Sequence, residues 1–340
     1  MVKFLFTIRA ATEALGEISI VDAIKNLMTT IFFATDIHGS HICWNKFINS
    51  GKFYNAETII LGGDITGKAI VPIIHLGGDS YRAVLLEQET QLDGEDAVQD
   101  MEKRIRSRGY YPYRTTPDEI TELKTQPEKL DALFTTEVRK TLGQWLVYAD
   151  EKLEGSGIRC LVTLGNDDAF DLDDLVRTSK HVHLADGECI PLDDHHEMIS
   201  SGWSNQTPWH TYREATEEQL QQRYANLIEK IKDPRQSIFN FHVPPFNSPL
   251  DQAPEMTADL RPRFAGNSMV PVGSTAVRAV IEEVQPLLGL FGHIHESKGT
   301  ARIGRTLCIN PGSMYEQGAL CGALISLGRN KIKTHMLTTG

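Results

Sequence analysis

Short apolar runs that end in polar residues recur along the chain. They are "TIFFATD" (30–36), "TIILGGD" (58–64), "RCLVTLGND" (159–167), "SIFNFHV" (237–243) and "LLGLFGHIH" (287–295). Fully apolar runs of this length are typical of buried strands in a layered α/β fold. In such sheets, ligands bind beyond the carboxyl ends of the strands. The pattern therefore predicts an α/β fold with its chemistry at those ends.

The middle of the chain does not follow this pattern of apolar runs that end in polar residues. Residues 69–88 predict a β-hairpin that turns at "GGD" (77–79), and residues 95–109 predict a helix. A longer apolar stripe predicts a helix from Pro127 that ends near Gly155. Its members are Leu130, Phe134, Val138, Leu142, Trp145, Ala149 and Leu153. We interpret 80–155 as a mostly helical insertion whose stripe packs on the main domain. The alternatives are a cap over the site or the surface of a homo-oligomer.

The C-terminal part of the chain returns to strands and helices, and the first 27 residues form an extension. "SGWSNQTPWHTYRE" (201–214) predicts a long polar and aromatic loop, residues 217–232 and 275–284 predict helices, and 307–313 and 321–337 predict closing strands. Within 1–27, apolar residues from Leu15 to Leu27 fall at helical spacing. This extension is either a short amphipathic helix or the product of a misassigned start, with Met28 as the alternative beginning. The predicted main domain is thus 28–340, interrupted by 80–155.

Composition narrows the class of protein. The 340 residues are 41% hydrophobic and 23% charged, and no segment approaches the roughly 20 apolar residues of a membrane span. We therefore expect no membrane partner. The five cysteines form no CxxC pair, so we expect reduced thiols in a cytoplasmic protein. The net charge of -11 argues against nucleic acid as the partner, because that backbone requires basic surface.

The residues at the strand ends are potential metal ligands. Carboxylate, imidazole and amide oxygen together suit Mn, Fe or Zn better than Mg or Ca. Seven such residues exceed the needs of one tetrahedral ion but suit two ions that clamp a phosphoryl group. They are Asp36, His38, Asp64, Asn166, His242, His293 and His295.

The ordered motifs "DIH", "GGD", "GND", "FHV" and "GHIH" resemble the calcineurin-like metallophosphoesterase superfamily. That family's pattern runs D-x-H, G-D, G-N-H-D/E, H and G-H-x-H, and the likeness covers residues 36–313. "SNQTPWHTYRE" (204–214), "HVPPFNSPLD" (242–251), "VGSTAVRAVIEEVQP" (272–286) and "GHIHESKGTARIGRTLCINPGS" (292–313) look like a prokaryotic branch that has GND in place of GNH. The resemblance implies a four-layer α/β/β/α sandwich.

The resemblance also implies roles for these residues. Two divalent ions are expected, with manganese the one to supply in vitro, and a metal-bridging hydroxide as nucleophile. Asp64 would bridge the ions, and Asn166 would contact both a metal and the phosphate. Asp36, His38, Asp64 and His295 would surround one ion, and Asp64, Asn166, His242 and His293 would surround the other.

Several residues compete with these assignments. A second "LGGD" contains Asp79, but its place in a turn explains the Gly-Gly-Asp without chemistry. His195 and His196 form a rival cluster at a hairpin turn, where we expect them to be solvated. "NPGS" (310–313) is either a turn or a phosphate contact. His41 begins a helix three residues after His38 and is a candidate to face the pocket.

The departure from the family pattern is Asp167, which stands where that pattern has histidine. Next to two divalent cations its pKa should fall, so Asp167 would not donate a proton near neutral pH. It would also repel a dianionic monoester more than a monoanionic diester. We therefore hypothesise a phosphodiesterase acting on a small phosphoester or nucleotide, with leaving-group protonation left to water or His41. Asp168 either supports the site or begins a helix.

Three other functions are compatible with the same fold. A nuclease, a protein phosphatase and a catalytically silent metal-binding scaffold are alternatives with the same fold. Substrate choice is expected to depend on residues 204–214 and on the insertion.

Overall fold

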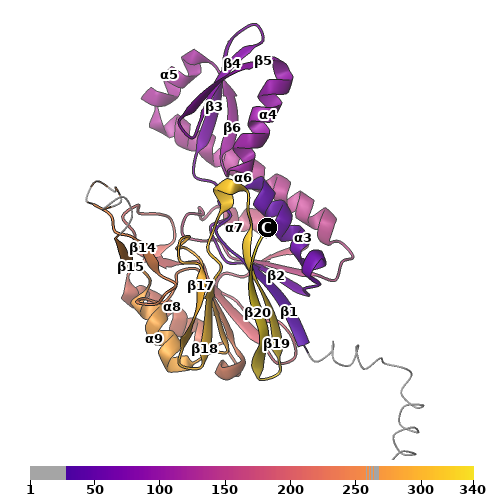
Figure 1. Cartoon of the computed structure of the whole chain (residues 1–340), viewed down its shortest axis with the longest axis vertical. Coiled ribbons are helices and arrows are strands. Elements are labelled where there is room, and N and C mark those ends of the chain that lie inside the picture. Colours follow the sequence, from indigo (N-terminus) through magenta and orange to yellow (C-terminus); the bar gives the residue numbers. More distant parts are fainter. Residues whose placement is uncertain (1–27, 258, 260, 262, 264–267) are drawn as a thin grey trace, which may run out of the picture.

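The computed structural model describes residues 28–340 except 258, 260, 262 and 264–267. The helix predicted within 1–27 lies outside the described residues. Two six-stranded sheets form the body of the molecule, and a smaller unit stands at one end of it (Figure 1). The mixed α/β fold that the sequence predicts is confirmed. Within the described part of the chain, none of the helices combines the length and the apolar character needed to cross a membrane.

The first sheet has the strand order β20-β19-β1-β2-β7-β8. β1, β2, β7 and β8 run parallel, and β19 and β20 add an antiparallel edge. The strands are β1 (Met28–Ala34), β2 (Thr58–Leu61), β7 (Arg159–Val162), β8 (Val182–Leu184), β19 (Cys321–Gly328) and β20 (Lys331–Thr339).

The second sheet has the order β17-β18-β16-β13-β10-β9. Its four central strands are parallel, and both edge strands are antiparallel to their neighbours. The strands are β9 (Cys189–Pro191), β10 (Glu197–Ser201), β13 (Ile238–Phe241), β16 (Leu288–Leu290), β17 (Gly299–Ile303) and β18 (Thr306–Asn310).

The sheets pack face to face between two helical layers. Successive side chains of a strand point to opposite faces, so Ile31 and Phe33 of β1 meet the second sheet while Phe32 and Ala34 meet helices. The outer face of the second sheet packs on another helical pair. These layers are α3 (His41–Tyr54), α6 (Pro127–Leu153) and α7 (Leu172–Val176) on one side, and α8 (Glu217–Ile228) and α9 (Thr275–Val284) on the other. The result is an α/β/β/α sandwich.

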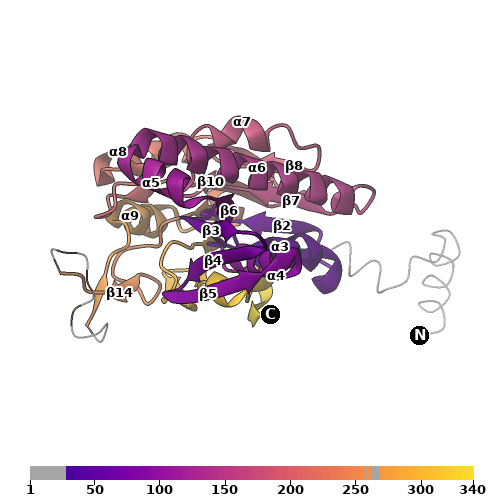
Figure 2. The ribbon, with the colours of Figure 1, turned by 90° about the horizontal axis from the view of Figure 1, so that it is seen from above.

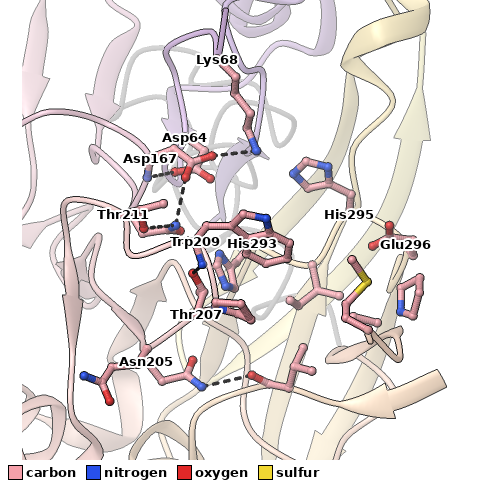
Figure 3. Close-up of a pocket in the computed structure, with 18 of the residues that line it drawn as sticks. Asp64, Lys68, Asp167, Asn205, Thr207, Trp209, Thr211, His293, His295 and Glu296 are labelled. Carbon is pink, nitrogen blue, oxygen red and sulfur yellow. Dashed lines mark hydrogen bonds and ion pairs between the residues drawn. The ribbon is translucent and has the colours of Figure 1, made fainter. Parts of the chain in front are cut away.

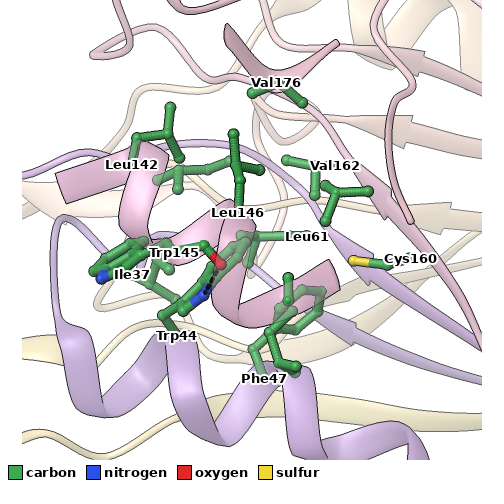
Figure 4. Close-up of a cluster of buried hydrophobic side chains, with 14 of the residues drawn as sticks. Ile37, Trp44, Phe47, Leu61, Leu142, Trp145, Leu146, Cys160, Val162 and Val176 are labelled. Carbon is green, nitrogen blue, oxygen red and sulfur yellow. Dashed lines mark hydrogen bonds between the residues drawn. The ribbon is translucent and has the colours of Figure 1, made fainter. Parts of the chain in front are cut away.

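The apolar stripe of α6 packs on the first sheet and on α3. Trp145 of α6 stacks on Trp44 of α3 with ring centroids 5.1 Å apart, and the Trp44 indole donates to the Trp145 carbonyl (Figure 4). Residues from Val138 to Leu153 on this stripe are buried in the same cluster. Packing on the main domain is therefore confirmed for this part of the helix, and a homo-oligomer through the insertion stays a prediction.

The smaller unit differs from the predicted insertion. It begins at residue 70 rather than 80 and is built on a four-stranded sheet, β5-β4-β3-β6 (Figure 2). This unit has its own apolar core. The predicted hairpin is present, but β5 and β6 were not predicted, because β5 has a single buried residue and β6 contains Pro112, which argues against a strand. Its elements are β3 (Ile70–Gly77), β4 (Ser80–Leu85), β5 (Gln88–Asp93), α4 (Gly94–Ser107), β6 (Tyr111–Thr115) and α5 (Pro117–Thr125).

Short elements complete the chain. Two small sheets pair β11 (Ser204–Asn205) with β12 (Glu214–Ala215) and β14 (Gln252–Pro254) with β15 (Met269–Pro271). Single 3-10 turns occupy Pro234–Gln236 and Tyr315–Gln317.

Candidate metal centre

The seven candidate ligands lie together at the carboxyl ends of parallel strands from both sheets. The first sheet contributes the residues that follow β1, β2 and β7, and the second contributes those that follow β13 and β16. Because the sheets pack face to face, these two sets of loops meet at one edge of the sandwich. In chain order the residues are Asp36 and His38, Asp64, Asn166, His242, and His293 and His295.

Asp36, His38 and His295 form one group whose ligand atoms all lie within 4.8 Å of one another. The Nε2 atoms of His38 and His295 are 2.9 Å apart, and His295 Nε2 is 3.4 Å from Asp36 Oδ1. Two donor atoms that each lie about 2.1 Å from one ion are about 3.0–3.4 Å apart. The spacing of this group is therefore that of ligands around a shared cation.

Asp64, His242 and His293 form a second group of the same size. Asp64 Oδ2 lies 3.4 Å from His242 Nε2 and 3.6 Å from His38 Nε2, so it faces both groups. This is the position that a bridging carboxylate occupies between two ions. The two groups match the two ligand sets that the family resemblance implies, while ligation itself stays a prediction.

Three buried atoms in this cluster, His38 Nδ1, Asn166 Oδ1 and His242 Nε2, lack a hydrogen-bond partner, and the last two point to a cation. His242 Nδ1 lies 3.0 Å from the Gly62 carbonyl, which can only accept, so Nδ1 carries a proton and Nε2, which has no hydrogen-bond partner, is the nitrogen left to meet a cation. Asn166 donates its amide NH₂ to Thr211 Oγ1 at 2.8 Å, and its Oδ1 has no partner. Buried polar atoms rarely stay unpaired, and both atoms are good metal ligands. The residues present therefore fit divalent cations.

The charges of the cluster lead to the same conclusion. Asp36 and Asp64 are 1% and 2% exposed, so two carboxylates share a buried space. Burial alone would lower the pKa of His242, but the Asp64 and Asp36 carboxylates raise it to about 10. Burial works to raise the pKa of Asp64, yet His242 and His38 hold it well below its usual value. Positive charge is thus strongly favoured here, and bound cations would supply it.

Four of the candidate ligands have strained backbones. The φ angles are 53° for Asp36, 37° for His38, 50° for Asp64 and 65° for His293. These values lie in the left-handed region, which residues other than glycine adopt only at an energetic cost. The backbone N–H of His293 donates to both carboxylate oxygens of Asp36, at 3.1 and 3.0 Å. Strain of this kind clusters at functional sites, where the surrounding structure maintains it.

Glycines next to the ligands make room for them. A Cβ on Gly63, whose φ is 127°, would collide with the imidazole of His242. A Cβ on Gly165 would collide with the carboxylate of Asp64. Gly63 and Gly165 are therefore required by the close approach of His242 from the other sheet and of Asp64 from the neighbouring strand.

Asp167 forms an ion pair with Lys68 that the sequence did not predict. Its Oδ2 lies 2.7 Å from Lys68 Nζ, and its backbone N–H donates to Asp64 Oδ1 at 3.0 Å (Figure 3). Burial and the Asp64 carboxylate raise the pKa of Asp167 to about 6, although Lys68 opposes this shift. Burial works against the Lys68 ammonium, but Asp167 and Asp64 raise its pKa above the usual value. The Lys68 ammonium therefore lies beside Asp167, at the position where the family pattern has histidine.

Asp168 is fully buried and holds two ligand loops together. Its carboxylate accepts the backbone N–H groups of Ile65 and Thr66 at 3.0 and 2.8 Å, and that of Gly165 at 2.7 Å. The Thr66 hydroxyl donates to it as well, at 2.6 Å. Of the two interpretations of Asp168, the structure favours support of the site.

His41 does not join the cluster. It is the first residue of α3, after the N-cap Ser40, and its Nδ1 accepts the Trp145 indole N–H at 3.0 Å. It is not among the described residues that line the cavity beside the metal centre. The helix start directs His41 toward α6, so the structure offers Lys68 rather than His41 beside the candidate ligands.

The rival residues are placed elsewhere. Asp79 is exposed in the β3–β4 turn, and His195 is exposed as expected. His196 is only 2% exposed, so its predicted solvation is wrong; its Nδ1 pairs with the Asp193 carboxylate at 2.7 Å. Asn310 of "NPGS" uses its side chain within the turn, accepting from the backbone N–H of residue 312 at 2.8 Å. The interpretation of "NPGS" as a turn is the one that the structure supports.

No protein-family model matches the sequence. The uncharacterized protein MJ1162 of Methanocaldococcus jannaschii is 33% identical over 116 residues, which is 34% of this chain and 47% of that protein. The match therefore spans about half the length of this relative.

Solved structures resemble the chain over most of its length. One crystal structure has a TM-score of 0.51 at 13% identity, covering 92% of this chain and 98% of its own. TT1561 of Thermus thermophilus has a TM-score of 0.48 at 13% identity with the same coverage. A novel archaeal phosphodiesterase matches more weakly, with a TM-score of 0.33 at 10% identity, covering 91% of this chain and 100% of its own. The first of these likenesses shows a shared fold.

Proposed function

We propose that this protein is a metal-dependent phosphoesterase that hydrolyses phosphodiesters. The observation that carries the proposal is the pair of ligand groups around Asp64, with the unpaired Asn166 Oδ1 and His242 Nε2 aimed into the same buried space. Two divalent ions held there would supply Lewis acidity and an activated water. The side chains named for them are Asp36, His38 and His295 on one side, and Asn166, His242 and His293 on the other, with Asp64 shared.

The charge beside the metal centre determines which class of phosphoester is favoured. The position of the expected imidazolium holds the ion pair of Lys68 and Asp167, whose net charge is zero. A neutral pair offers less attraction to a dianionic monoester than a free cation would, so the monoanionic diester is favoured. Lys68 is the group that can donate a hydrogen bond to a phosphate oxygen, and Asp167 holds it in place.

The test is turnover after metal loading. Protein stripped with a chelator and reloaded with Mn²⁺ is expected to hydrolyse phenyl p-nitrophenyl phosphate faster than p-nitrophenyl phosphate. Faster cleavage of the monoester would contradict the diesterase assignment. Two bound ions without turnover of either ester would instead favour a metal-binding scaffold, and cleavage of single-stranded DNA at a higher rate than the diester would favour a nuclease.

Lys68→Met is expected to lower kcat/KM for the diester by about 10–100-fold, because a charge-assisted hydrogen bond contributes about 1.5–3 kcal/mol. Metal content, measured by inductively coupled plasma mass spectrometry, should not change. Lys68→Arg keeps the charge and should retain most of the activity. Lys103→Met removes a lysine whose side chain is 70% exposed on α4 and serves as the control. Equal activity of Lys68→Met and the wild type would exclude this role.

A further inference from the structure

The metal centre forms one end of a larger cavity of about 900 Å³. Asp64, Asn166, His293 and His295 line that end. A phosphate group fills only a small part of such a volume, which is in the range of pockets for drug-sized ligands. The remainder of the cavity is therefore available to whatever is esterified to the phosphate.

The far part of the cavity is apolar and has two walls. Residues 205–212, between β11 and β12, supply one wall with Pro208, Trp209 and Tyr212 (Figure 3 labels Trp209 beside His293). The pair β14 and β15 supplies the other, including Pro254 and Val270. The lining thus changes from ionic to apolar within one continuous space.

The wall that carries Trp209 is held in place by polar contacts. Glu214 Oε1 accepts the Thr207 hydroxyl at 2.5 Å, and the Thr211 N–H and hydroxyl at 2.9 and 2.8 Å. The Tyr212 N–H donates to the Asn166 carbonyl at 3.0 Å. Since Asn166 also donates its side-chain amide to Thr211, the wall is fixed to a candidate metal ligand.

Two aromatic rings on this wall are about half exposed. Trp209 is 59% and Tyr212 is 50% exposed, although both line the cavity. Large aromatic side chains left open in a pocket are a favourable surface for stacking on a flat ring. The amide side chains of Asn205 and Gln206 line the same wall, where they can meet polar atoms at a ring's edge.

The charge of the lining limits the class of ligand. Among the described residues that line the cavity, Lys68 is the single lysine or arginine, and it is already paired with Asp167. Glu296 adds a negative charge to the lining. A polyphosphate or a nucleic-acid strand would find no basic partners for its further phosphates. The occupant of the apolar part should therefore be uncharged.

We propose that this part of the cavity binds a flat, uncharged aromatic group of the phosphodiester substrate, stacked on Trp209. The inference deepens the proposed function and rests on it. The substrate class is then a single phosphodiester that carries an aryl group or a nucleobase on one side. Trp209 is a specificity-determining residue that does not act on the reacting atoms.

Calorimetric titration of the manganese-loaded protein tests this without requiring turnover. The probes are dimethyl phosphate, methyl phenyl phosphate, methyl octyl phosphate and the methyl ester of thymidine 5′-monophosphate. Methyl phenyl phosphate is expected to bind at least about tenfold more tightly than dimethyl phosphate. Trp209→Ala should reduce this difference to about threefold or less while leaving dimethyl phosphate unchanged, and Trp209→Phe should restore most of it.

Phe53→Ala is the matched control, because that ring is 79% exposed on α3 and does not line the cavity. Tighter binding of the thymidine ester than of the phenyl ester would identify a nucleobase as the aromatic group, and the reverse order would identify a simple aryl group. Equal affinity of the wild type for all four probes, a preference for the octyl ester, or equal loss for every probe in Trp209→Ala would overturn the inference. A protein that hydrolyses nothing but keeps the Trp209-dependent preference would reject the proposed function alone.

Discussion

Asp64→Asn is expected to lose its bound metal ions and to lower diester hydrolysis by about a thousandfold. Asp64 Oδ2 faces both ligand groups, at 3.4 Å from His242 Nε2 and 3.6 Å from His38 Nε2. The amide removes the negative charge that two cations would share. The Asp64 Oδ1 that accepts the Asp167 N–H is retained as an amide oxygen, so the fold should persist.

Metal content by mass spectrometry and turnover of phenyl p-nitrophenyl phosphate are the two measurements for this variant. Asp79→Asn changes the other aspartate of an "LGGD" sequence, which is exposed in a turn, and should match the wild type in both. If Asp64→Asn retained two ions and full turnover, the candidate centre would not be the site of the reaction.

Asp168→Ala is expected to lower the free energy of unfolding by about 3–5 kcal/mol. The substitution leaves three buried backbone N–H groups, those of Ile65, Thr66 and Gly165, without their acceptor. Each unpaired buried donor costs about 1–3 kcal/mol, and water enters this fully buried position poorly. The loops that carry Asp64 and Asn166 would lose their common support, so metal affinity should fall as well.

Urea denaturation of the chelated protein measures this loss without a contribution from bound metal. Asp174→Ala removes an exposed aspartate of α7 and should cost less than about 1 kcal/mol. A cost for Asp168→Ala as small as that of Asp174→Ala would show that the carboxylate does not brace the loops.

The strands and candidate ligands could be predicted because their signal is local. "TIFFATD" and "TIILGGD" each combine a buried run with the polar residues that follow it, and parallel strands bring such ends to one edge. Asp36 and Asp64 were therefore found from the sequence without contact information. The left-handed φ of these residues was not predictable, because the packing of two sheets imposes it.

The residues that were missed depend on contacts between distant segments. Lys68 follows Gly67 in a loop, and nothing near it in the chain indicates a partner 99 residues away at Asp167. His41 lies close to His38 in sequence, but the Trp145 indole on another helix draws it away from the cavity. The sheet of the smaller unit was missed for a different reason, since β5 has a single buried residue and β6 contains a proline.

The division of the ligands between two sheets has a consequence for folding. Asp36, His38, Asp64 and Asn166 come from one sheet, and His242, His293 and His295 come from the other, so neither sheet alone can bind an ion with the full set. Cations would then bind the assembled sandwich and not its separated halves, and mass action would favour assembly. For such a protein the supply of divalent metal in its surroundings is a thermodynamic variable of folding, and metal starvation would lower the free energy of unfolding of a sandwich that stays folded.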